Sequence, residues 1–120
     1  MDQHLTAILP CNDLDAGEAL FARPGSTRLP GSIENYRMLS DNRGGFLHLQ
    51  PAAEGWLVPG RNPFGLYLCR KDVDGAAAAF AGELIGQDRP GDKPWGMYEF
   101  ALNAPDGGLA RVGWPTRSGS

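Results

Sequence analysis

The residues of this sequence that could perform chemistry are few and widely spaced. His48 and Arg111 each lie in a short apolar run that follows a Gly-Gly pair. A lone histidine of this kind can be a metal ligand, a general base or a hydrogen-bonded packing residue, and packing is the commonest of these roles. Arg111 can equally pair with an acid or clamp a ligand. Cys69 would need a nearby base to act as a nucleophile, and the sequence contains no serine elbow, P-loop or dinucleotide fingerprint.

His48 and Arg111 belong to the two copies of a duplicated pattern. Segment 13–22 corresponds to 72–81, and segment 44–49 corresponds to 107–112; the matched side chains include Asp13, Asp15 and Phe21 with Asp72, Asp74 and Phe80. Two copies are too few for a solenoid, which needs three or more repeats to bury a continuous face. We therefore expect a single domain over 1–120, with module one at 4–50, a linker at 51–63 and module two at 64–115.

The sequence pattern of each module predicts a strand, then a helix, then further strands. An apolar run without helical periodicity leads into an aspartate that can cap the first turn of a helix. Segment 51–63 is too rich in proline and glycine for a regular element. We expect helices at 14–22 and 73–85, the second longer because of its alanines, with Phe21 and Phe80 buried at equivalent places on them. The expected strands lie at 5–11, 33–39, 46–50, 64–70, 95–102 and 109–114, with a weak edge strand at 27–29 and a polar loop at 87–94.

The strands that follow from this pattern have two different faces. Alternate side chains of a strand point to opposite sides, so each module has a face that packs on its helix and an open face. The open faces should together form a concave groove lined by Thr6, Phe46, His48, Gln50, Tyr67, Cys69 and Arg111. Tyr98 and Glu99 are neighbours on one strand, so only one of them faces the groove, and the sequence does not say which.

Composition restricts the class of partner. The chain has 120 residues, 21% of them charged, and a net charge of −3, so it lacks the basic surface of a nucleic-acid-binding protein. This balance favours a cationic or neutral small molecule. We expect no signal peptide and no membrane-spanning segment, and we expect a cytoplasmic protein. In that reducing compartment Cys11 and Cys69 are expected to be packed thiols and not a disulfide.

The order of elements resembles the vicinal oxygen chelate superfamily, which includes glyoxalases, bleomycin-resistance proteins and dioxygenases. The Asp-x-Asp starts of the two helices resemble its strand-to-helix motif. The stretch Pro-Trp-Gly-Met-Tyr-Glu-Phe-Ala-Leu at 94–102, with Pro-Asp-Gly at 105–107, resembles the bleomycin-resistance branch in particular. The resemblance implies an α+β fold in which two βαβββ modules form a half-barrel cleft. It also implies a two-fold homodimer with clefts at or near the interface, often with exchange of the N-terminal strand.

The resemblance also locates the positions at which metallo-enzymes of the superfamily hold a divalent ion. Those four strand positions, which carry His, Gln or Glu in the enzymes, fall here on Thr6, His48, Gly65 and Arg111. Only His48 is a good ligand, because threonine binds poorly, glycine has no side chain and arginine brings a positive charge. We therefore expect no metal and no other cofactor.

The function expected from the resemblance is that of a metal-free protein that sequesters an antibiotic without altering it. A cationic drug of the bleomycin type would stack on aromatic rings and make cation–π contacts. The expected ligand-binding residues are Phe46, His48, Trp56, Tyr67, Trp95, Tyr98 and Arg111, with Tyr36 as a further aromatic candidate. The alternative is a metal-dependent enzyme of the same superfamily, such as a lyase, an isomerase or an antibiotic-modifying transferase. A third reading is an unrelated ligand or a protein partner, because fold does not determine function.

Overall fold

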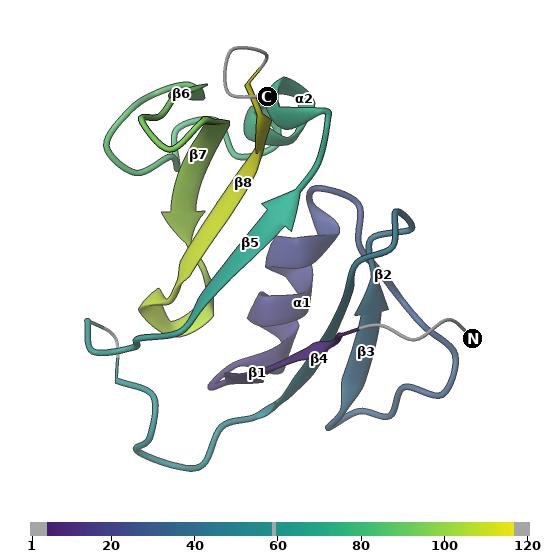
Figure 1. The fold of residues 1–120 in the computed structure, drawn as a ribbon. Coiled ribbons are helices and arrows are strands. Elements are labelled where there is room, and N and C mark those ends of the chain that lie inside the picture. Colours follow the sequence, from purple (N-terminus) through teal and green to yellow (C-terminus); the bar gives the residue numbers. More distant parts are fainter. Residues whose placement is uncertain (1–4, 59, 117–120) are drawn as a thin grey trace. The chain divides into compact units, whose positions relative to one another are not determined.

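The structure is a computed structural model that describes residues 5–58 and 60–116, so the first residue of the expected module one lies outside the described residues. The chain divides into two compact units, Met1–Arg61 and Asn62–Ser120. Among the described residues, each unit contains one sheet and one α-helix (Figure 1). Within the described residues, no helix is both long enough and apolar enough to cross a membrane.

Unit one has the predicted order of a strand, a helix and three strands. The elements are β1 (Ala7–Cys11), α1 (Leu14–Ala22), β2 (Thr27–Arg28), β3 (Arg37–Ser40) and β4 (Phe46–Pro51). The sheet order is β1-β4-β3-β2, with β1 parallel to β4 and the other pairs antiparallel. The strand expected at 33–39 begins later, at Arg37, because residues 33 and 36 form only an isolated bridge.

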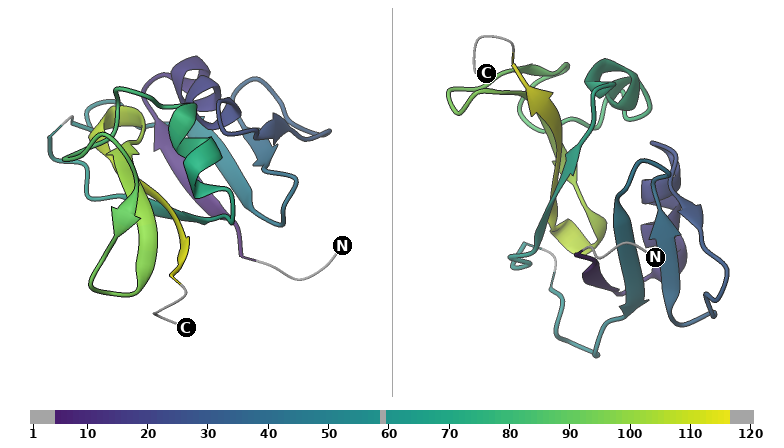
Figure 2. Two further views of the ribbon diagram at one scale, coloured as in Figure 1. Left: turned by 90° about the horizontal axis from the view of Figure 1, so that it is seen from above. Right: turned by 45° about the vertical axis from the view of Figure 1, so that its right-hand side comes forward.

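Unit two repeats this connectivity, which confirms the two βαβββ modules and the α+β fold class. Its elements are β5 (Gly65–Cys69), α2 (Val73–Ala78), β6 (Gly91–Asp92), β7 (Met97–Asn103), a short 3-10 turn (Pro105–Gly107) and β8 (Leu109–Pro115). The sheet order is β5-β8-β7-β6, with β5 parallel to β8 (Figure 2). The short strand β6 lies inside the segment expected to be a loop.

The matched aspartates at the two helix starts make different contacts. Asp13 caps α1, because its Oδ1 accepts a hydrogen bond of 3.1 Å from the Ala16 N–H. Asp72 makes no such cap. Its carboxylate accepts hydrogen bonds of 2.8 and 2.6 Å from Nε and Nη2 of Arg70. The repeat therefore conserves the residue type at this position but not its interaction.

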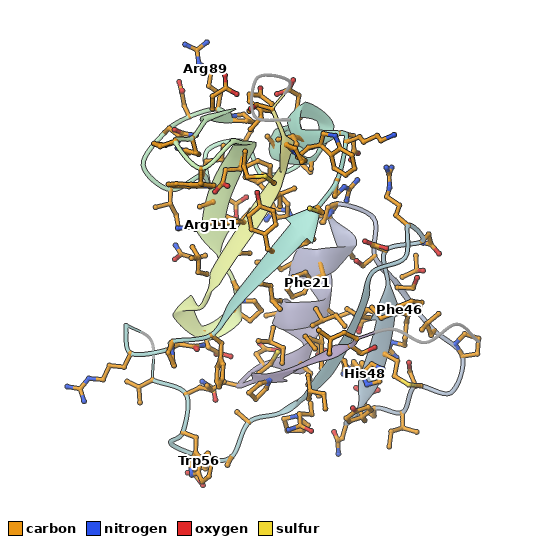
Figure 3. The ribbon with its side chains drawn as sticks, in the orientation of Figure 1. Phe21, Phe46, His48, Trp56, Arg89 and Arg111 are labelled. Atoms are coloured by element: carbon orange, nitrogen blue, oxygen red, sulfur yellow. The ribbon has the colours of Figure 1, made fainter. Side chains whose placement is uncertain are left out.

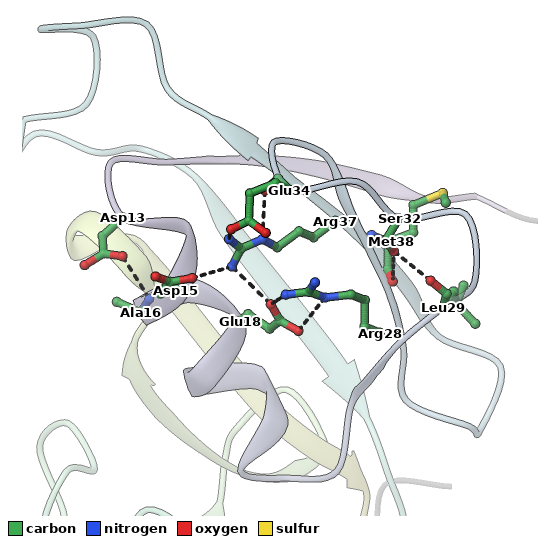
Figure 4. Close-up of polar contacts among 10 residues, drawn as sticks. All are labelled: Asp13, Asp15, Ala16, Glu18, Arg28, Leu29, Ser32, Glu34, Arg37 and Met38. Carbon is green, nitrogen blue, oxygen red and sulfur yellow. Dashed lines mark hydrogen bonds and ion pairs between the residues drawn. The ribbon is translucent and has the colours of Figure 1, made fainter.

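The helix side of sheet one contains a buried arginine. Arg37 on β3 is 3% exposed, and its guanidinium donates to Asp15 (2.8 Å) and Glu18 (3.1 Å) of α1 and to Glu34 (2.5 Å), as Figure 4 shows. Hydrogen bonding to Arg28 lowers the pKa of Glu18. A buried charge needs such partners because leaving water is costly, so this network attaches the helix to the sheet.

Alternation along the strands sorts apolar side chains onto the helix sides. In unit one the buried residues include Leu9, Phe21, Leu39 and Leu49. In unit two they include Phe80, Phe100, Leu102, Ala110 and Val112. Cys11 is also buried, whereas Cys69 is exposed on the other side of its strand, and neither forms a disulfide. The expectation of a packed thiol is therefore wrong for Cys69.

The second helix is shorter than its alanine content predicts. It ends at Ala78 and not at residue 85, and the chain continues in tight turns closed by bonds such as Phe80 N–H to Ala77 O (3.0 Å). Gly82, with φ of +83°, lies in those turns, a backbone conformation that ends helices. Phe80 consequently lies beyond the helix and packs on Phe100 with ring centroids 6.5 Å apart. Helix propensity alone is a weak determinant, which tertiary packing overrides here.

Replacing Phe80 by alanine should lower the free energy of unfolding by about 3–5 kcal/mol, because a fully buried phenylalanine leaves a cavity. The matched control is Phe64→Ala, since Phe64 is half exposed in the same unit, and it should cost only about 1 kcal/mol. Urea denaturation followed by circular dichroism measures both. Equal losses in the two variants would contradict the packing described for Phe80.

Candidate functional site

Three side chains meet at the buried carboxylate of a fourth on the open side of sheet two. Glu99 on β7 is 2% exposed. Its Oε1 accepts hydrogen bonds from the Tyr67 hydroxyl (3.0 Å) and from the Trp95 indole N–H (2.7 Å). Its Oε2 lies 3.6 Å from Nε of Arg111. We call Tyr67, Trp95, Glu99 and Arg111 the Glu99 cluster.

The strand register explains how Tyr67 reaches Glu99. Tyr67 on β5 is paired with Arg111 on β8, whereas Glu99 on β7 is paired with Gly113. The Tyr67 side chain must therefore cross β8 diagonally. It can do so because Gly113 has no side chain: a Cβ there would lie 2.4 Å from the Tyr67 hydroxyl oxygen and 2.6 Å from Cβ of Glu99.

Trp95 enters the cluster from the turn that precedes β7. The Gly96 N–H donates to Lys93 O (3.0 Å), and Gly96 has φ of +84°, which favours glycine. The indole is 56% exposed, although its N–H is bound to Glu99. The guanidinium carbon of Arg111 lies 5.6 Å from the centre of the Trp95 ring, within the range of a cation–π contact.

The accessible groups of the Glu99 cluster are hydrogen-bond donors and aromatic rings, whereas its carboxylate is enclosed. Burial raises the pKa of the Tyr67 hydroxyl, and the hydrogen bond to Glu99 raises it further, so Tyr67 remains a protonated donor at neutral pH. One carboxylate oxygen accepts two hydrogen bonds and the other faces Arg111. Glu99 therefore holds its neighbours in place, and it is too enclosed to act as a general base toward a ligand.

Of the residues expected to bind a ligand, Tyr67, Trp95 and Arg111 come together here. Tyr98 does not join them, because it points to the opposite face of β7 and its hydroxyl donates to Oδ1 of Asp74 at 2.5 Å. That hydrogen bond also raises the pKa of Tyr98. The structure thus answers the question that the sequence left open, since Glu99 and not Tyr98 lies on the open face.

The other expected ligand residues belong to unit one. Phe46 and His48 lie on the open face of β4, opposite the buried Leu49 (Figure 3). His48 Nδ1 shares a hydrogen bond of 2.7 Å with the Tyr36 hydroxyl, and the two rings meet edge to face with centroids 5.1 Å apart. The histidine therefore has the packing contact that its sequence context favours. Trp56 is exposed in the linker.

The residues at the four positions given by the resemblance do not fit a divalent metal. Arg111 faces Glu99, His48 is bound to Tyr36, and Thr6 and Gly65 supply one weak ligand and none. Across the described ranges 5–58 and 60–116, no three His, Cys, Asp or Glu side chains are grouped as a metal site requires.

Sequence reasoning left the choice between Glu99 and Tyr98 open, and it did not identify Gly113 as a contributor to this site. A signal for Glu99 was present, because residues four apart on a strand share a face and Trp95 precedes Glu99 by that spacing. The role of Gly113 depends on the diagonal path of Tyr67, which only the strand register reveals.

Replacing Gly113 by alanine should lower the free energy of unfolding by about 1–3 kcal/mol, the usual cost of overpacking, because the new methyl group would collide with Tyr67 and Glu99. Gly65→Ala is the matched control on the same face, since a Cβ there would lie 3.6 Å from Leu109 O and 3.9 Å from Leu109 Cβ, which are ordinary contacts. Thermal unfolding and the near-ultraviolet circular dichroism of the aromatic rings report both effects. A stable Gly113→Ala variant with unchanged aromatic signals would contradict the described path of Tyr67.

Comparison with known proteins gives structural neighbours only, since no protein-family model and no curated protein matches the sequence. A bleomycin-binding protein in complex with bleomycin is 21% identical with a TM-score of 0.77, covering 94% of this chain and 98% of its own. A bleomycin resistance determinant encoded on the transposon Tn5 is 23% identical with a TM-score of 0.75, covering 95% and 98%.

A third neighbour has a broader name than the first two. It is a glyoxalase/bleomycin resistance protein/dioxygenase from Nocardioides, 18% identical with a TM-score of 0.70, and the match covers 100% of this chain and 88% of that one. Identities this low establish the fold and leave the activity open. The resemblance read from the sequence is confirmed at that level: the chain has the glyoxalase/bleomycin-resistance fold.

Proposed function

We propose that this protein binds an antibiotic of the bleomycin type through its aromatic rings and sequesters it without chemistry. The observation that carries the proposal is the Glu99 cluster, in which two aromatic rings and a guanidinium are fixed around an enclosed carboxylate. The names of two neighbours, a bleomycin-binding protein and a bleomycin resistance determinant, support the same class of ligand.

The cluster suits stacking because its rings are both exposed and held. Trp95 is 56% and Tyr67 is 43% exposed, yet each polar end is hydrogen-bonded to Glu99. An aromatic contact is worth about 0.5–1.5 kcal/mol beyond area burial. Side chains that are already ordered lose less conformational entropy on binding. Phe46 and His48 on the open face of sheet one are proposed as further ligand contacts.

We also propose that binding needs no metal, in contrast to the enzymes of this fold. The support is the set of side chains at the four expected positions, where only His48 is a good ligand. The second candidate function, a metal-dependent lyase, isomerase or transferase, would require a ligand set that these side chains do not supply. We also propose a cytoplasmic location. On the sequence resemblance we propose a homodimer, and light scattering of the purified protein measures its mass.

Protein purified without chelators should contain well under one zinc, nickel, iron or manganese per chain, because threonine, glycine and arginine occupy three of the four positions. Elemental analysis gives the stoichiometry. Treatment with EDTA should leave the melting temperature and bleomycin affinity unchanged. About one tightly bound metal per chain, or loss of binding after EDTA, would favour the enzyme.

Metal-free bleomycin should bind in isothermal titration calorimetry, and Trp95→Ala should weaken binding about 2- to 30-fold, the range of one stacking or cation–π contact. Trp95→Phe should lose less, because it keeps a ring while losing the N–H to Glu99. Trp114→Ala is the control, since Trp114 lies on the opposite face of β8 from Arg111.

Two results would count against this proposal. If wild-type protein shows no heat of binding with bleomycin, the ligand is misassigned. If folded Trp95→Ala and Trp114→Ala bind bleomycin equally well, the Glu99 cluster is not the binding surface.

A further inference from the structure

The charges on the open face of sheet two are unequally accessible. The two ionised side chains among the strand residues described there are Glu99 and Arg111. Glu99 is 2% exposed, whereas the Arg111 side chain is 42% exposed. A ligand that approaches this face therefore meets a positive charge, although the chain as a whole has a net charge of −3.

The guanidinium of Arg111 is oriented but not saturated. Its Nε lies 3.6 Å from Glu99 Oε2, which is too long for a hydrogen bond and leaves an electrostatic attraction. Among the described residues, neither Nη group donates a hydrogen bond. Trp95 lies beside them at 5.6 Å. The result is a fork of donors next to an exposed aromatic surface.

Such a fork matches one kind of chemical group. The parallel N–H bonds of arginine fit the two oxygens of a carboxylate or a similar oxyanion, and charge strengthens these bonds. A cationic group would find no accessible acid on this part of the face, because both Glu99 oxygens are enclosed by Tyr67, Trp95 and Arg111.

We propose that Arg111, oriented by the buried Glu99, selects a ligand whose flat ring carries an oxyanion or another strong acceptor. This inference rests on the proposed function for the use of Trp95 and Tyr67 as the ring-binding surface. The ligand that we infer here differs from the cationic ligand that the net charge of the chain favours. The local charge is positive because Arg111 is exposed, whereas its partner Glu99 is buried. Glu99 is then a positioning residue that does not touch the ligand.

Three probes that share one ring test the charge directly: 2-naphthoate, 2-naphthamide and 2-naphthylmethylammonium. We expect the affinity order carboxylate, amide, ammonium, with the carboxylate bound about tenfold or more tighter than the ammonium, the size of a charge-assisted hydrogen bond. Titrations followed by tryptophan fluorescence or ligand-observed NMR give the three dissociation constants. Equal or reversed affinities, or no binding of the carboxylate, would overturn the inference.

Variants then assign the preference to Arg111. Arg111→Met should abolish the advantage of the carboxylate over the amide, and Arg111→Lys, which keeps a positive charge beside Glu99, should retain only part of it. Arg89→Met is the matched control, since it removes the same charge from a loop of the same unit, away from the Glu99 cluster (Figure 3). A preference that survives Arg111→Met, or that falls equally in Arg89→Met, would contradict the assignment.

The role of Glu99 has a separate readout. Glu99→Gln keeps an oxygen that can accept from Tyr67 and Trp95 but removes the charge that attracts Arg111. It should reduce the carboxylate preference while amide binding and the near-ultraviolet signal of Trp95 persist. An unchanged preference would show that Glu99 does not position Arg111.

The bleomycin titration separates the two proposals. If bleomycin binds and the probes show no carboxylate preference, only the present inference fails. If the carboxylate preference depends on Arg111 and bleomycin does not bind, the proposed function fails and the site accepts another aromatic oxyanion.

Discussion

Each unit of this protein contains a buried charge whose partners organise the side chains around it. In unit two the charge is the Glu99 carboxylate, which accepts from Tyr67 and Trp95 and attracts Arg111. In unit one it is the Arg37 guanidinium, which binds three carboxylates. An ionised group that leaves water is tolerated only with such partners. The partner side chains lose conformational freedom when they bind the buried charge. The need to replace its lost water contacts therefore produces a rigid arrangement of side chains.

The two charges act on opposite sides of equivalent sheets. Arg37 faces α1 and binds helix to sheet, so its network stabilises the fold. Glu99 faces away from α2, so its network orders groups at the surface. The same topology therefore carries a network that attaches helix to sheet in unit one and a candidate site in unit two. The same divergence appears at the helix starts, where Asp13 caps a helix and Asp72 binds Arg70.

Sequence patterns determined the fold better than they determined the site. The repeat and the pleat were enough to predict two βαβββ modules and to place Tyr67 and Arg111 on one face, because both depend on local order along the chain. The end of α2 was missed because the burial of Phe80 outweighs the propensity of its alanines. Strand β6 was missed because a strand of two residues is too short to show an alternation of apolar and polar side chains. The convergence on Glu99 was missed because it needs the register of β5, β8 and β7 together.

Gly113 restricts which residues of the site can be replaced while the others remain. Any larger residue at this position would occupy the space of the Tyr67 hydroxyl and Cβ of Glu99. Residue 113 therefore stays constrained even when Tyr67 and Glu99 change, because Cβ of residue 99 is lost only in glycine, whereas Tyr67 and Glu99 can vary while the glycine at 113 remains. Descendants with a new ligand preference should accordingly retain the glycine as a trace of the ancestral arrangement after its partners have been replaced.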